Sequence, residues 1–208
     1  MYARLWDAFG PQGWWPGDTA FEVMIGAILT QNTNWKNVAL ALNGLKAEGL
    51  LEPRALRELP EGELALRIRS AGYFNVKARR LQNFLDFFAH RFDDSLEKMA
   101  QEDLPTLRAS LLSVKGIGPE TADSILLYAL HLPTFVVDAY TFRVLNRHHL
   151  AAEPCSYEDL QALFMEHLPA DVSLYQEFHA LLVRLGKEYC RPRPRCSGCP
   201  LHEWPVTG

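Results

Sequence analysis

The feature that most constrains the fold is a helical spacing of apolar residues that recurs along nearly the whole chain. Apolar side chains fall three and four positions apart in segment after segment, and no run alternates long enough to predict a sheet. The stretch 134–137 is too short to count as a strand. The helical segments are 21–30, 36–45, 63–70, 76–92, 104–112, 119–130, 138–147, 157–167 and 175–189. We therefore predict an all-α protein.

Local signals mark several helix boundaries. Ser156 is followed three residues later by Asp159, as in a capping box. Pro119 suits the first turn of a helix because its missing N–H has no partner to lose there. Gly72 and Gly186 interrupt the helical pattern. These signals support the division into separate helices.

Composition sets limits on size and partners. The chain has 208 residues, 48% of them apolar and 22% charged, which allows one compact domain or two small lobes. Its net charge of −4 excludes a basic nucleic-acid coat protein, so any contact with DNA must come from local features. No run approaches the roughly 18 apolar residues of a membrane span, and the first residues lack a secretory pattern. We therefore expect no membrane association and a cytoplasmic location.

A glycine-containing turn separates two of the predicted helices. It reads Lys115-Gly116-Ile117-Gly118, and a helix follows directly. Glycines let backbone N–H groups approach a ligand closely, and a helix N-terminus carries partial positive charge that favours phosphate. An ordinary helix–helix turn fits the same residues equally well.

Four stretches, taken in order, carry a family resemblance. They are ILTQNT (28–33), GYFNVKA (72–78), GIGPETA (116–122) and VVDAYTFRVLNR (136–147). Together they resemble the helix-hairpin-helix glycosylases of base-excision repair, the endonuclease III superfamily, and the resemblance covers nearly the whole chain. It implies a two-lobed fold with a DNA-binding cleft between the lobes. One lobe would be a six-helix lobe with the hairpin, 20–132, and the other would join 1–19 to 133–208.

The resemblance also implies roles in DNA binding. Gln31 matches the family's glutamine that enters the gap left by a flipped base. Tyr73 lies in the segment that matches the family's wedge loop, against the DNA stack. The hairpin residues Lys115, Gly116 and Gly118 match the phosphate-binding turn.

Asp138 is a lone carboxylate in an apolar and aromatic run, and it matches the aspartate of the family. Cleavage of an N-glycosidic bond builds positive charge on the sugar, which a nearby carboxylate stabilises while it orients or deprotonates water. Asp138 also suits a helix N-cap. The two roles are compatible, and the resemblance favours the catalytic one.

Glu120 stands where bifunctional members of the superfamily have a lysine, 18 residues before the aspartate. A carboxylate cannot form the Schiff base that leads to strand cleavage. A first-turn acid favoured by the helix dipole is the alternative reading of Glu120. The resemblance therefore implies a monofunctional enzyme, with Glu120 as a second carboxylate facing the flipped nucleoside.

The sequence is similar in particular to bacterial 3-methyladenine glycosylases built on the endonuclease III scaffold. That branch has a glutamate at the position of Glu120, an early Trp-Trp-Pro and an aromatic residue just after the LTQNT-like segment. Here these are Trp14, Trp15, Pro16 and Trp35. A cationic methylated base needs an electron-rich surface on which to stack. We predict a substrate pocket from these four residues; core packing of the tryptophans is the alternative.

Three of the four cysteines crowd near the end of the chain, at Cys190, Cys196 and Cys199. Their segment resembles the iron–sulfur loop of endonuclease III, in which four cysteines hold a [4Fe–4S] cluster. The fourth would fall at Pro205. A cluster completed by His202 or Cys155, and a loop without metal, both remain open.

The predicted function is that of a monofunctional DNA glycosylase that acts as a monomer on double-stranded DNA containing a damaged base. Its substrate would be an alkylated purine such as 3-methyladenine. Two alternatives remain. One is an endonuclease III-like glycosylase for oxidised pyrimidines, with weak or no lyase activity. The other is a non-catalytic helix-hairpin-helix protein that binds damaged DNA.

Overall fold

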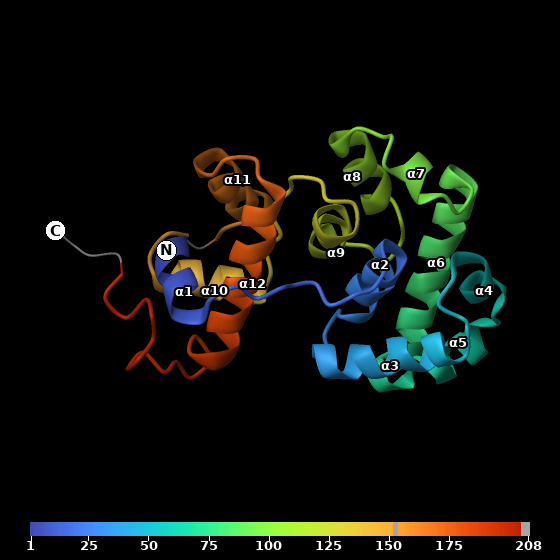
Figure 1. Cartoon of the computed structure of the whole chain (residues 1–208), viewed down its shortest axis with the longest axis horizontal. Helices are drawn as coiled ribbons and strands as arrows, with labels where there is room; N and C mark the ends of the chain where they lie inside the picture. The colour runs from blue at the N-terminus through green and yellow to red at the C-terminus, as the bar shows by residue number, and fades with distance from the viewer. Residues whose placement is uncertain (152–153, 205–208) are drawn as a thin grey trace. The chain divides into compact units, whose positions relative to one another are not determined.

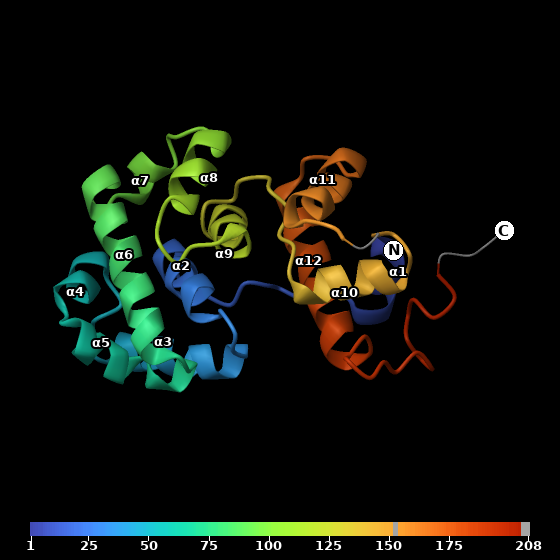
Figure 2. The same cartoon turned by 180° about the vertical axis from the view of Figure 1, so that it is seen from behind.

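The computed structural model of the chain describes residues 1–151 and 154–204, and none of these residues forms a strand (Figures 1 and 2). The all-α prediction is confirmed. A 3₁₀ turn (η1) and a stretch of π-helix (η2) accompany the α-helices. The elements are α1 (Tyr2–Phe9), α2 (Ala20–Leu29), α3 (Trp35–Ala47), α4 (Pro53–Glu58), α5 (Glu61–Arg67), η1 (Arg69–Ala71), α6 (Phe74–Phe92), α7 (Leu96–Met99), α8 (Leu104–Leu112), α9 (Pro119–Ser124), η2 (Ile125–Ala129), α10 (Ala139–Arg147), α11 (Tyr157–His167) and α12 (Val172–Glu188).

The chain divides into two compact units. The central unit is Pro16–Leu132, and the terminal unit joins Met1–Trp15 to the described residues of Pro133–Gly208. The hairpin therefore belongs to the central unit and Asp138 to the terminal unit.

The central unit is built around α2, which is buried on nearly all sides. This is what its apolar sequence predicts, because a helix without a polar face has no side that favours water. The long helix α6 packs against α2, α4 and α5. Its Phe84 and Phe88 stack on each other, and Phe88 also stacks on Phe21 of α2.

The terminal unit is built around α12, which packs against α1 and α10. An aromatic cluster fills its core: Phe135 stacks on Phe164 of α11, and both rings meet Phe178 edge-on. Gly186 of α12 faces Tyr140 of α10 so closely that a Cβ atom there would lie 2.3 Å from Tyr140 Cδ1. The glycine that interrupts the sequence pattern does not end the helix; it lets two helices approach.

Several predicted boundaries are confirmed. Helices α8 and α11 have the predicted limits, and Ser156 and Asp159 form the predicted capping box. Pro119 lies in the first turn of α9. The segment predicted as one helix over 119–130 is α-helical only to Ser124 and continues as the π-helix η2.

Three helices escaped prediction: α1, α4 and α7. They have eight, six and four residues, and the two shorter ones offer too few turns for a helical spacing of apolar residues to be recognised. Among the described residues, no helix is both long and apolar enough to cross a bilayer.

Candidate active site

Asp138 sits at the N-cap of α10, with an extended backbone and a side chain that is 11% exposed. Its Oδ1 accepts hydrogen bonds from the backbone N–H of Thr141 (2.7 Å) and from Thr141 Oγ1 (2.8 Å). The capping role is therefore present, and a cap of this kind contributes about 1 kcal/mol to stability. Both of these bonds go to Oδ1, and neither involves Oδ2.

His179 of α12 lies beside the other oxygen of this carboxylate. Its Nε2 lies 3.7 Å from Asp138 Oδ2. Burial by itself would raise the pKa of Asp138, but the interaction with His179 and the two bonds from Thr141 outweigh it, so the pKa is lowered. Asp138 is therefore a carboxylate at neutral pH even though little of it is exposed.

Lys187, also on α12, lies in the same electrostatic environment. Its ammonium nitrogen is 5.2 Å from the centre of the Trp14 ring. Loss of water around the amine lowers the pKa of Lys187, and the charge of Asp138 opposes part of this shift. Trp14 in turn meets Trp15 edge-on, with ring centres 5.5 Å apart. Both tryptophans are half-buried, which leaves part of each ring accessible.

His179 and Lys187 were missed by the sequence reasoning. Neither belongs to the motifs that carry the resemblance, and they lie some 40 to 50 residues beyond Asp138 in the chain. The one signal in the sequence is that a histidine stands within the apolar pattern of 175–189. Histidine is buried less often than apolar residues, so its presence there indicates a polar partner inside the protein.

In the central unit, the hairpin turn joins α8 to α9. Gly116 has a φ of +101°, a conformation that side chains other than glycine's rarely adopt. Gly118 has an extended backbone that any residue could adopt, and no protein atom lies within 4 Å of where its Cβ would be. Glu120 is exposed in the first turn of α9, and Lys115 is exposed in the turn itself.

Gln31 lies two residues beyond the end of α2, and its side chain contacts the hairpin. Gln31 Nε2 donates to the carbonyl oxygen of Gly116 (3.1 Å) and to Thr121 Oγ1 (2.9 Å). Its Oε1 accepts a hydrogen bond from Arg80 Nη1 of α6. The structure thus brings together two of the motifs that lie far apart in the sequence, at Gln31 and at the hairpin.

Tyr73 precedes α6 and is 70% exposed. Its backbone is left-handed, with a φ of 48°. Few residues as large as tyrosine adopt this conformation. Trp35 opens α3 and is half-buried, and Pro16 is exposed at the start of the central unit.

Comparison with known proteins identifies the family. The model of the HhH-GPD superfamily base excision DNA repair proteins matches residues 25–170. This chain belongs to that superfamily. The glycosylase is 47% identical over 206 residues to the "Putative DNA repair glycosylase MJ1434" of Methanocaldococcus jannaschii, covering 98% of this chain and 93% of that one.

Two further relatives have more specific names. It is 27% identical to endonuclease III of Sulfolobus acidocaldarius, over 88% of this chain and 80% of that one. A solved structure of Helicobacter pylori 3-methyladenine DNA glycosylase bound to 1,N6-ethenoadenine is 32% identical, with a TM-score of 0.72, covering 84% of this chain and 88% of that one. The predicted superfamily is confirmed, and the chain is a DNA N-glycosylase of base-excision repair.

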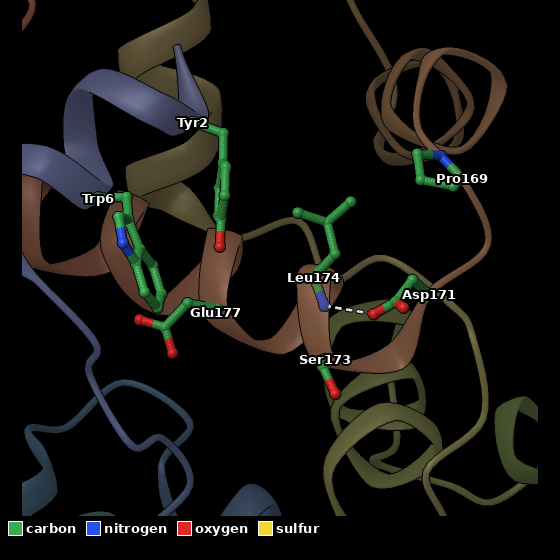
Figure 3. A pocket seen from close by; sticks show the side chains of 7 residues that line it. All are labelled: Tyr2, Trp6, Pro169, Asp171, Ser173, Leu174 and Glu177. Carbon is green, nitrogen blue, oxygen red and sulfur yellow. Dashed lines mark hydrogen bonds between the residues drawn. The ribbon is translucent and has the colours of Figure 1, made fainter.

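Each unit of the glycosylase has a cavity on its surface among the described residues. In the terminal unit a cavity of about 390 Å³ lies between α1 and α12, and Figure 3 shows Trp6 and Glu177 at its wall. Its carboxylates, from Asp171 and Glu177, make it unsuitable for phosphate. None of the predicted site residues lines it.

The second cavity, of about 350 Å³, lies between α6 and the hairpin in the central unit. Three of its lining side chains are cationic, from Arg79, Arg80 and Lys115. Gly116 lines it too. Arg79 is paired with Glu61, but Arg80 and Lys115 still give the lining a positive charge, which favours phosphate although the chain as a whole is acidic.

The cysteine-containing tail of the glycosylase is the candidate metal site. Cys190 is buried and its Sγ accepts a hydrogen bond from Arg147 Nη1 (3.3 Å), while Cys196 is exposed. Burial and the neighbouring thiols raise the pKa of Cys199. Pro205, where the fourth ligand would fall, lies outside the described residues.

The alternative fourth ligands do not complete a site either. His202 is exposed, and Cys155 lies just before α11. Within 1–151 and 154–204, no three His, Cys, Asp or Glu side chains gather as metal ligands. A [4Fe–4S] cluster is therefore not confirmed by the described residues, although the loop resembles the segment that holds one in endonuclease III.

Proposed function

We propose that the glycosylase is monofunctional and releases an alkylated purine, such as 3-methyladenine, from double-stranded DNA by hydrolysis, acting as a monomer. The observation that carries this proposal is the ionised Asp138, with Oδ1 held by Thr141 and Oδ2 left for a substrate. The 32% identity to the Helicobacter pylori 3-methyladenine DNA glycosylase supports the choice of substrate.

In the proposed reaction, Asp138 acts on the sugar of a flipped nucleotide. As the bond between C1′ and the base breaks, positive charge develops on the sugar, and Asp138 Oδ2 stabilises it. The same oxygen orients a water molecule for attack on C1′, and it accepts the proton that this water loses. Since Oδ1 is fixed by two hydrogen bonds, the carboxylate is held in place before the substrate arrives.

Glu120 supports the monofunctional part of the proposal. Strand cleavage by a glycosylase needs an amine that attacks C1′, and a carboxylate cannot form that iminium. Glu120 is exposed in the first turn of α9, where we propose that it faces the flipped nucleoside.

The tryptophans support a cationic base as substrate. The ammonium of Lys187 over the Trp14 ring shows that this ring holds a cation at its face. A base methylated at N3 carries positive charge and leaves without prior protonation, so stacking suffices to hold it. We propose that Trp14, Trp15, Pro16 and Trp35 form the pocket and that the base takes the place of the Lys187 ammonium.

The remaining motifs support DNA binding. The missing Cβ of Gly118 leaves open space that no part of the chain fills, which suits a phosphate approaching the hairpin at Lys115 and Gly116. The exposed ring of Tyr73 suits a wedge against stacked bases. We propose that Gln31, next to the hairpin, occupies the position of the flipped base.

The experiment is a release assay on duplexes that contain 3-methyladenine. We expect the Asp138→Asn variant, which keeps the cap but loses the charge, to release base about 10² to 10⁴ times more slowly than wild type. Asp171→Asn is the matched control, because Asp171 caps α12 in the same way, accepting from Leu174 N at 2.7 Å. Equal release by wild type and Asp138→Asn would contradict the proposal.

An endonuclease III-like activity on oxidised pyrimidines is the second candidate, favoured by the 27% identity to the Sulfolobus enzyme. Duplexes that contain an oxidised pyrimidine distinguish the two, because release from these and not from alkylated DNA selects the second. Borohydride trapping tests the lyase step separately. A covalent adduct would show that an amine, such as that of Lys187, acts despite Glu120.

A further inference from the structure

One side of α6 connects three segments that belong to the DNA-binding motifs. Residues 77, 80 and 83 are three apart and therefore lie on neighbouring positions of the helix surface. Lys77 Nζ donates to the carbonyl oxygens of Leu29 (2.8 Å) and Ala71 (2.6 Å). Asn83 Nδ2 donates to the carbonyl oxygen of Lys115 (2.9 Å). Between them, Arg80 reaches the Gln31 side chain.

The Gln31 amide is held from three directions. Its Oε1 accepts from Arg80, and both hydrogens of Nε2 have acceptors, at the Gly116 carbonyl and at Thr121 Oγ1. An amide group has two N–H donors, so no donor is left over. The partners also fix which end is oxygen, because the arginine can only donate and the carbonyl can only accept.

Arg80 fits closely against the hairpin as well. A Cβ atom on Gly116 would lie 2.4 Å from Arg80 Cγ and 3.0 Å from Arg80 Cδ. The stem of the arginine thus occupies the space that glycine leaves open. Gly116 is required here by packing against Arg80 as well as by its positive φ.

The charge of Arg80 distinguishes it from the residue beside it. Arg79 forms an ion pair with Glu61, at 2.9 Å. Arg80 Nη1 donates instead to Oε1 of Gln31. Its guanidinium is directed to a neutral amide oxygen, which makes a charge-assisted hydrogen bond that is stronger than one between two neutral groups.

We propose that Arg80 is a positioning residue that fixes Gln31 against the hairpin, so that both meet damaged DNA in one prearranged geometry. A side chain that is already ordered loses less conformational freedom on binding, so affinity rises. The proposal rests on the family's action on DNA and on the DNA-binding role proposed for Gln31, but it is independent of which base is removed.

The experiment measures affinity for two duplexes of the same sequence, one with a tetrahydrofuran abasic-site analogue and one undamaged. We expect Arg80→Met to weaken binding to the abasic duplex about tenfold, which is the effect of 1.4 kcal/mol. Arg79→Met is the control for the loss of an arginine from α6, because Arg79 is the next residue and is paired with Glu61 instead of with Gln31. On the undamaged duplex the two variants should behave alike.

A double-mutant cycle with Gln31→Ala tests whether Arg80 acts through Gln31. We expect Arg80→Met combined with Gln31→Ala to bind the abasic duplex as Gln31→Ala alone does, within about twofold. Arg79→Met combined with Gln31→Ala should instead show the two separate effects multiplied. If Arg80→Met acted only by destabilising the fold, its effect on affinity would be the same with and without the Gln31 side chain, and the Arg80 cycle would be additive like the Arg79 cycle.

Two results would overturn the proposal. If Arg80→Met weakens both duplexes equally and its effect multiplies with that of Gln31→Ala, Arg80 contacts a phosphate directly. If Arg80→Met binds the abasic duplex more tightly, Arg80 holds Gln31 away from DNA. Should Arg80→Met fail to fold, a second double-mutant cycle combines Arg80→Lys with Thr121→Val, which removes the other side-chain partner of the Gln31 amide. We expect the effects of these two changes on affinity for the abasic duplex to be non-additive as well. Because the analogue has no base, none of these results depends on the proposed substrate.

Discussion

At the scale of single residues, Lys77 is the most unusual group in the central unit. Its side chain is 1% exposed, and both of its recorded hydrogen bonds go to backbone carbonyls at the ends of α2 and η1. The negative ends of the two helix dipoles favour a cation there. Burial nevertheless lowers the pKa of Lys77 to about 8, with a smaller contribution from the charge of Arg80.

This lowered pKa predicts how stability changes with pH. The folded pKa of about 8 is below the value of 10.5 for an unperturbed lysine, so the unfolded chain binds the extra proton between these two pH values. The contribution of Lys77 to the free energy of unfolding should therefore become more favourable as the pH increases from about 8 to 10.5. Urea unfolding of wild type and Lys77→Met across this range measures the difference. A difference that stays constant, or falls, would contradict the assignment.

Sequence reasoning found the exposed residues of this region more readily than the buried ones. Tyr73 lies in a recognisable motif, but nothing in the helical pattern marks Lys77 as buried, since lysine is almost never fully buried. The bond from Arg80 to Gln31 was equally hidden, because the residues are 49 positions apart. Local patterns carry no information about such pairs.

At the scale of elements, the contact between α10 and α12 fixes the helix that begins after Asp138. Gly186→Ala would place a Cβ atom 2.3 Å from Tyr140 Cδ1 and force the helices apart. We expect this change to lower the free energy of unfolding by about 1 to 3 kcal/mol, as overpacked cores do. Because Asp138 is carried on α10, base release should slow as well.

Gly44→Ala is the matched control for this prediction. Gly44 lies within α3, and nothing is within 4 Å of where its Cβ would be. Alanine should therefore raise the free energy of unfolding by about 0.4 to 1 kcal/mol. Chemical denaturation of both variants measures the two opposite signs, and a destabilisation of the same size in both would show that helix contact is not the cause.

The tail is held by α10 through its basic residues. Arg143 Nε donates to the Cys190 carbonyl (2.6 Å), and Arg147 donates to the carbonyls of Arg191 (2.6 Å) and Pro192 (3.0 Å). His148 Nδ1 lies 2.6 Å from the carbonyl oxygen of Trp204. These hydrogen bonds attach the tail to α10.

We therefore expect the tail to stay folded without metal. The double variant Cys196→Ser and Cys199→Ser should melt within about 1 °C of wild type, because neither thiol is buried in the core. Arg147→Met should melt lower and be cleaved faster by protease within the tail. Stoichiometric iron in wild type that is lost from the double variant would contradict this expectation.

Most helices of the fold were predictable because they are long enough for periodicity to register, as α6 and α11 show. The π-helix η2 was not, because it keeps the apolar composition of a helix while changing its hydrogen bonding. For the candidate site, the sequence motifs pointed to Asp138 and to the hairpin, and their roles stay predictions. Its supporting residues, His179 and Lys187, depend on how α12 packs and could not be found from the sequence.

At the scale of the whole molecule, the chain order differs from the spatial grouping. The central unit is one continuous stretch, whereas the terminal unit combines the beginning of the chain with the part after Leu132. Helix α1 packs on α12, where Tyr2 meets Phe178 edge-on and Arg184 lies over Phe9. The N-terminal residues therefore find their partners only in the last helix.

This arrangement has a consequence for biosynthesis. Residues 16–132 leave the ribosome as a complete set, so their core can close while translation continues. Helix α1, although made first, stays without its partner until α12 emerges. A chain interrupted after Leu132 would thus contain the complete central unit but neither α10 nor α12, the two helices on which the terminal unit is built.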